Sequence, residues 1–161
     1  MSDKIKVDAL RATKLAAELN EEQCRVLANL VTLRNLKQGE VLAREGTMDN
    51  HLYVILHGNL GVIKHAGTPE ALTINTLSAG DFVSEMGFMD GTEVYASKVA
   101  LGDTQVLGLE REKLESLLTT HPVIVYRVMR AIIRVVHQIQ RRLSMQQAEL
   151  SNYIYKQHGR Y

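Results

Sequence analysis

The spacing of apolar residues changes along the chain, beginning with a helical pattern. In residues 8–31, apolar side chains such as Leu10 and Leu15 recur every three or four positions, which favours amphipathic helix. Asn20 is followed by two glutamates and a glutamine, a pattern typical of a capped helix start. We therefore predict two short helices in residues 1–31.

Short apolar runs separated by frequent glycines fill residues 32–110. Strands at this spacing predict a β-roll of the jelly-roll type, a double-stranded β-helix. The segment HLYVILHGNLGVIKH (51–65) predicts a hairpin that turns near Gly58, and HAGTPEALTI (65–74) predicts a second, looser hairpin tip. The fold class is therefore mainly β with flanking helices.

The strand pattern stops after Leu109, and residues 111–150 favour helix again. A short helix is predicted over 111–119, and Pro122 occupies the first position of a longer helix that reaches about Leu150. Apolar residues at seven-residue spacing form two heptad positions along this helix, with β-branched residues at one of them. We predict a homodimer formed through Val125, Met129, Ile132, Val136, Ile139 and Leu143.

The alternative is that the stripe packs on the domain's own sheet, and we expect this of its first half. Residues 151–161 are predicted to be a frayed tail outside the single domain.

Composition restricts the classes of protein that fit. The chain has 161 residues, 45% hydrophobic and 23% charged, which is normal for a globular protein. A net charge of +1 gives no global attraction to nucleic acid or membrane. The single cysteine, Cys24, excludes an intramolecular disulfide and is expected to be a buried apolar residue. No run reaches the roughly 18 apolar residues of a membrane span, so we expect a cytoplasmic protein.

One segment, GDFVSEMGFMDGTEVYASKVA (80–100), has a layout that suits anion binding. It predicts a turn, one short helical turn and then a strand, so that backbone amides point at a common centre. Two acids, Glu85 and Glu93, flank the turn, and the segment contains no arginine.

Three blocks of the chain resemble the cyclic nucleotide-binding domain of regulators such as catabolite activator protein and Fnr. They are LKQGEVLAREGTMDNHLYVILHGNLGVI (36–63), LSAGDFVSEMGFMDG (77–91) and DTQVLGLEREKLESLLTTHPVIVYRVMRAI (103–132). The resemblance implies the β-roll fold, and it implies a ligand cassette made by Ser84, Glu85, Met86, Gly87, Val94, Tyr95 and Ser97.

The chain departs from the family where the phosphate is held. The family cassette reads roughly Phe-Gly-Glu, an apolar turn, and then Pro-Arg-(Ser or Ala)-Ala-Thr. Here Ser84 replaces the glycine, Glu93 the proline and Val94 the arginine. Glu85, which in the family holds the ribose hydroxyl, is kept. A lost charge-assisted pair of about 3 kcal/mol weakens binding roughly a hundredfold.

The sequence leaves several roles open at this cassette. A substitute cation would have to be Lys98, about 13 Å along the strand from Val94, or Arg141 or Arg142 on the long helix. Ser84 either caps the helical turn or contacts a ligand. Glu85 is held by backbone amides or contacts a ligand. Val94 and Tyr95 face inward, with Tyr95 as a plug, or the pocket takes a less anionic ligand.

We therefore expect a regulatory domain with a degenerate cassette that signals to a protein partner through its C-terminal helix. The alternative is a functional cAMP or cGMP receptor with a substitute phosphate anchor. An enzyme is not expected, because no nucleophile elbow occurs. A metal site is not expected either, because no His-x-His pair occurs; His57 or His65 would be the haem ligand in a gas sensor. The residues after Leu150 are too few for a helix-turn-helix.

Overall fold

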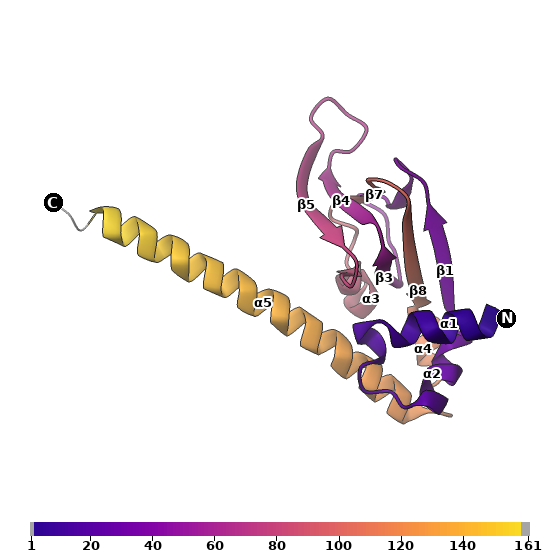
Figure 1. Cartoon of the computed structure of the whole chain (residues 1–161). Coiled ribbons are helices and arrows are strands. Elements are labelled where there is room, and N and C mark those ends of the chain that lie inside the picture. The colour runs from indigo at the N-terminus through magenta and orange to yellow at the C-terminus, as the bar shows by residue number, and fades with distance from the viewer. Residues whose placement is uncertain (1, 159–161) are drawn as a thin grey trace.

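Helices at both ends of the chain enclose a central run of strands (Figure 1). The computed structural model describes residues 2–158. The helices are α1 (Ser2–Arg11), the 3-10 helix η1 (Lys14–Ala16), α2 (Glu21–Ala28), α3 (Glu85–Asp90), α4 (Arg111–Glu115) and α5 (Pro122–His158). The strands are β1 (Val31–Leu36), β2 (Val41–Ala43), β3 (His51–His57), β4 (Asn59–Lys64), β5 (Leu72–Ser78), β6 (Phe82–Val83), β7 (Ser97–Ala100) and β8 (Thr104–Glu110).

The strands form two four-stranded antiparallel sheets that face each other as a β-roll. Their orders are β1-β8-β3-β6 and β2-β7-β4-β5. Apolar residues of both sheets, among them Ile55, Leu60 and Val106, fill the space inside the roll. The fold class predicted from the sequence is confirmed.

The predicted hairpin over residues 51–65 is wrong. β3 pairs with β6 and β8, whereas β4 pairs with β5 and β7, so the two strands lie in different sheets. Gly58 turns the chain from one sheet to the other with a φ of +87°, and a Cβ there would lie 2.5 Å from the Asp103 carbonyl oxygen. The second predicted hairpin is confirmed, because β4 and β5 pair across the tip at 65–71.

The N-terminal helices pack with the start of α5 on the outside of the first sheet. Leu10, Leu27, Leu107 and Ile124 are buried in this second core. Asn20 caps the start of α2 as predicted. Its side chain accepts a hydrogen bond from the Gln23 backbone amide, and the Gln23 side chain accepts one from the Asn20 backbone amide. Cys24 is buried here as expected, and burial raises the pKa of its thiol.

The helix α5 is longer than predicted and leaves the roll as a single rod (Figure 1). Its 37 residues extend about 55 Å at 1.5 Å per residue. It begins at Pro122 as predicted but continues to His158, into the segment expected to be a frayed tail, because no glycine or proline interrupts the sequence before residue 159. Arg160, assigned to that tail, lies outside the described residues.

The predicted dimer stripe is buried within the protomer over its first half. Val125 and Ile132 belong to the core formed with the N-terminal helices, and Met129 packs against it. The first half of the stripe therefore packs within its own domain, as expected from the sequence. Val125 and Ile132 are lost from the predicted interface, and Met129 is partly buried. Ile139 and Leu143 are 38% and 59% exposed, and Val136 is 40% exposed.

Candidate functional site

The predicted turn, helical turn and strand are present as β6, α3 and β7. Ser84, at the N-cap of α3, has a left-handed backbone with φ 64° and ψ 27°. A non-glycine residue in this region costs roughly 1–2 kcal/mol, which accounts for the family's preference for glycine at this position. The Ser84 hydroxyl is buried, has no hydrogen-bond partner among the described residues and does not cap the helix. Ser84 therefore occupies the predicted N-cap position, but the predicted side-chain cap bond is absent.

The next three cassette residues open the helix α3 with different environments. Glu85 is half-buried, and its carboxylate has no hydrogen bond within residues 2–158, so the predicted hold by backbone amides is absent. Met86 is 62% exposed. Gly87 packs so closely on the turn before β3 that a Cβ would lie 2.7 Å from the Asp49 carbonyl oxygen. The cassette helix is thus fixed by backbone contact with that turn.

The arginine position of the cassette is closed by an apolar side chain. Val94 is buried. Its backbone carbonyl accepts a hydrogen bond from the Gly46 amide, and its backbone amide donates one to the Thr47 carbonyl. Ser97 is also buried, and its hydroxyl accepts from the Glu45 amide at 3.0 Å. Both residues therefore have structural partners rather than open binding groups.

Tyr95 does not plug the pocket. Its ring is 60% exposed, and the Lys64 ammonium lies 5.1 Å from the ring centroid. The same ammonium donates to the Tyr95 carbonyl and pairs with Glu45. The plug interpretation is wrong because this lysine holds the ring at the outer edge of the site.

A cation does lie inside the cassette, at Lys98. The ammonium is half-buried and donates to the Ala96 carbonyl at 2.8 Å. Burial lowers the pKa of Lys98, and the negative charges of Glu85 and Asp49 act in the opposite direction. The distance along the strand made Lys98 seem too remote in the sequence, but its long side chain folds back beside the cassette.

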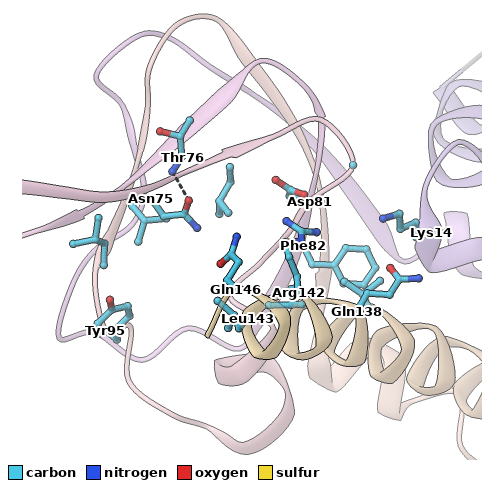
Figure 2. A pocket seen from close by; sticks show the side chains of 16 residues that line it. Lys14, Asn75, Thr76, Asp81, Phe82, Tyr95, Gln138, Arg142, Leu143 and Gln146 are labelled. Carbon is cyan, nitrogen blue, oxygen red and sulfur yellow. Dashed lines mark hydrogen bonds between the residues drawn. The ribbon is translucent and has the colours of Figure 1, made fainter. Parts of the chain in front are cut away.

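A cavity of about 540 Å³ opens next to the cassette, between the roll and α5. Strand β5 and the turn after it form one wall, with Asn75, Thr76 and Asp81, and α5 forms the other, with Gln138, Arg142 and Gln146. Figure 2 shows Tyr95 and Lys14 toward opposite ends of the cavity, with Arg142 between them. Arg142 thus lies at the site as considered from the sequence, whereas Arg141 does not line it.

Comparison with known proteins identifies the family to which this fold belongs. The family model for the cyclic nucleotide-binding domain matches residues 33–121, more than half of the chain. The chain belongs to the cyclic nucleotide-binding domain family. It is 26% identical over 126 residues to the cyclic AMP receptor protein of Thermus thermophilus, covering 78% of this chain and 58% of that protein.

Two further relatives show how widely the cyclic nucleotide-binding domain is used. The chain is 28% identical over 115 residues to cGMP-dependent protein kinase isozyme 1 of Drosophila melanogaster, covering 70% of this chain and 15% of the kinase. A crystal structure of a cyclic nucleotide-binding domain from Methylobacillus flagellatus KT is 25% identical with a TM-score of 0.76, covering 88% of this chain and 81% of that one. The chain thus spans less than two thirds of the length of its curated relatives: 58% of the Thermus receptor protein and 15% of the Drosophila kinase.

A carboxylate that the sequence reasoning missed, Asp49, lies beside the cassette. Asp49 accepts hydrogen bonds from the His51 amide and from His51 Nδ1, both at 3.0 Å. Burial, followed by the charge of Asp49, raises the pKa of Tyr53 to about 12. The side-chain parity of Val94, Ala96 and Lys98 was the signal for Lys98, but no local pattern pointed to Asp49, which reaches the site from another turn.

Residues 2–158 contain no group of three or more His, Cys, Asp or Glu side chains arranged to hold a metal ion. None of the helices in this range combines the length and apolar character needed to cross a bilayer.

Proposed function

We propose that this chain is a regulatory domain whose cassette does not hold a cyclic nucleotide phosphate with useful affinity. Its output is the position and pairing of α5. The observation that carries this proposal is the charge of the cradle: Val94 fills the arginine position, and the nearby ammonium of Lys98 already bonds to Ala96. Two carboxylates, Glu85 and Asp49, are close enough to influence that ammonium.

The charges around the cradle oppose a phosphate. Two carboxylates against one ammonium leave the cradle without the excess positive charge that a buried phosphate requires. The amides at the start of α3 contribute only a partial charge, worth roughly 0.3–2 kcal/mol. An arginine fork would add charge-assisted hydrogen bonds of about 1.5–3 kcal/mol each, so its absence weakens binding by about a hundredfold or more.

The exposed second half of α5 supports a role in signalling. Val136, Ile139 and Leu143 present an apolar stripe beyond the part of the helix that is buried in its own domain. A second copy of the helix is the partner that fits a heptad stripe. A change in the angle at which α5 leaves the roll would shift the population between two ways of pairing the helices. We place this regulatory domain in the cytoplasm, acting on a protein partner rather than catalysing a reaction.

Titration calorimetry of cAMP and cGMP tests the proposal directly. The wild-type protein should give no binding heat at about 0.1 mM ligand. This concentration is about a hundredfold above a micromolar dissociation constant, so it would saturate a site of that affinity. Val94→Arg should gain measurable binding, whereas Val99→Arg, which adds the same charge on the opposite face of β7, should not. Circular dichroism checks that both variants fold. Micromolar binding by the wild-type protein would contradict the proposal.

One observation favours a second candidate function. The half-buried ammonium of Lys98, beside Glu85, is placed to serve as the substitute phosphate anchor of a true cAMP or cGMP receptor. If the wild-type protein binds either nucleotide and Lys98→Met loses that binding, this second function replaces the first.

A further inference from the structure

Strand β5 is a long, uncharged edge of the roll. Within residues 2–158 only β4 pairs with it, so its other edge has no partner strand (Figure 1). Six of its seven residues are exposed, and its sequence LTINTLS contains neither a charged residue nor a proline. An edge strand of this kind offers unpaired backbone groups to another extended segment, including a copy of itself.

The other three edges of the two sheets are protected in ordinary ways. β2 and β6 have only three and two residues, which is too short to hold a partner strand. β1 carries the exposed charge of Arg34. On β5, a bulge interrupts the ladder at Ile74 but leaves residues 75–78 as a regular edge. Neither length, charge nor a bulge therefore protects this regular part of β5.

Two side chains occupy backbone amides along the regular part. The Asn75 carboxamide oxygen accepts from the Thr76 amide at 2.8 Å (Figure 2), and the Asp81 carboxylate accepts from the Ser78 amide at 2.8 Å. Alternate residues of a strand direct their backbone groups to the same side, so these two amides point the same way. Both donors are thus filled by the chain itself.

The pairing of Ser78 shows that this side is the free edge. Ser78 lies opposite Asn59 of β4, and the Asn59 carbonyl accepts from the amide of Leu101, next to β7 on the side away from β5. Such a pair exchanges no hydrogen bonds, because hydrogen-bonded and non-hydrogen-bonded pairs alternate in an antiparallel ladder. The Ser78 amide therefore points away from β4, and so does the Thr76 amide two residues before it.

We propose that β5 is a latent pairing edge for a second copy of this chain, kept closed by the side chains of Asn75 and Asp81. The partner segment is the β5 strand of that copy, antiparallel to the first, so that the two sheets would join into one. Self-pairing brings no like charges together, because residues 72–78 carry none. It also covers Leu72 and Ile74, which are 60% and 39% exposed.

A second strand would form its ladder only by displacing both side chains. The outer amides of Thr76 and Ser78 are the donors that a new ladder needs, and each is already bonded. Asp81 also fixes the turn after β5, since its own amide donates to the Ser78 carbonyl at 3.0 Å. Opening the edge therefore requires this turn to loosen as well. Neither the cassette nor α5 takes part in this contact.

Light scattering of the full chain measures whether removing these side chains opens the edge. Every variant also carries Leu143→Glu, so that association through the stripe of α5 does not add to the molar mass. Asn75→Ala combined with Asp81→Ala should double the molar mass relative to the Leu143→Glu parent at high micromolar concentration. Asn75→Ala alone keeps the turn and should associate in the same way, but more weakly.

Two further variants control for nonspecific association. Asn35→Ala removes an exposed asparagine from the edge strand β1, where its side chain makes no hydrogen bond within residues 2–158, so the molar mass should not change. Adding Thr76→Lys to the double variant should return it to the mass of the parent, because it places like charges together at the centre of the new contact. Circular dichroism checks that each variant folds.

Hydrogen exchange of the backbone amides, followed by nuclear magnetic resonance, identifies the contact as this edge. In dilute solution the Thr76 amide of the double variant should exchange about fivefold faster than in the parent, the effect of losing one hydrogen bond. At high concentration the same amide should become protected again, while the amides of β1 should not change. Lower stability alone would not produce protection that rises with protein concentration.

A molar mass equal to that of the parent, or a higher mass without concentration-dependent protection of the β5 amides, would overturn the proposal. Association of Asn35→Ala as strong as that of the double variant would do the same. The proposed function is judged separately by the cyclic nucleotide titration, because all of these variants keep the cassette residues Glu85, Val94 and Lys98.

Discussion

Replacing Glu18 should loosen the contact between the N-terminal helices and α5. Glu18 follows η1, and one of its carboxylate oxygens lies 2.9 Å from Arg134 Nη1 and 3.4 Å from Arg130 Nε. Arg127 adds a bond from its Nη1 to the Glu18 carbonyl oxygen at 3.3 Å. Three arginines on successive turns of α5 thus hold one short loop.

The magnitude follows from the exposure of these groups. The two arginine side chains are about half exposed and Glu18 is 21% exposed, so each ion pair is worth roughly 0.2–1 kcal/mol. Glu18→Gln removes both and keeps the backbone bond, so we expect a loss of about 1 kcal/mol, or about 3 °C in Tm for a chain of this length. Urea unfolding followed by circular dichroism measures it.

Glu21→Gln is the matched control. It removes an ion pair with Arg25 that lies within α2 and is exposed on both sides, so its loss should be about 0.4 kcal/mol. The effect of Glu18→Gln should also shrink in 1 M salt, where the Debye length is about 3 Å. Equal losses for the two variants at low salt would refute the idea that Glu18 links the two helical parts.

Three other outcomes follow from the structure. Gly58→Ala should lower the free energy of unfolding by about 3 kcal/mol, because it adds a Cβ 2.5 Å from a backbone oxygen at a residue with φ +87°. Gly39 has a similar φ of +86° but open space around it, so Gly39→Ala should cost only about 1 kcal/mol. Thermal unfolding of the two variants measures the difference. The pKa of Tyr53 is about 12 in the folded protein, so above pH 10 the folded state binds more protons than the unfolded state. The free energy of unfolding should therefore fall as the pH rises from 10 to 12. Tyr53→Phe should make this fall smaller in unfolding experiments. Leu143→Glu should convert a dimer to a monomer in light scattering, whereas the control Arg141→Glu should not. A wild-type protein that is monomeric at micromolar concentration would contradict the prediction that the stripe forms a dimer interface.

The architecture was predictable because its signals are local. Regular glycines between short apolar runs indicated a roll, and the capped start at Asn20 and Pro122 placed two helices correctly. The hairpin was misassigned because a glycine between two apolar strands gives the same pattern whether the chain folds back or crosses to another sheet. The tight space around Gly58 is set by Asp103 and Thr104, far away in the sequence, so no local pattern could show that the chain crosses to the other sheet.

The cassette was less predictable, because its electrostatics depend on distant segments. The loss of the family's arginine could be read at Val94, but the position of Lys98 depends on how a long side chain folds back to a carbonyl. Asp49 enters from the turn before β3, and Lys14 enters the neighbouring cavity from η1.

The division of α5 fits the proposal that one helix serves both stability and signalling. Its first half is fixed, since Val128 and Ile132 are buried against the N-terminal helices and arginines of the same half hold Glu18. Its second half makes no such core, yet it forms one wall of the cavity and presents Leu143. A rigid helix anchored at one end amplifies a small change at the cavity into a larger displacement at its far end. Under the proposed regulatory function, a change in the lean of the helix would alter how the exposed stripe meets its partner.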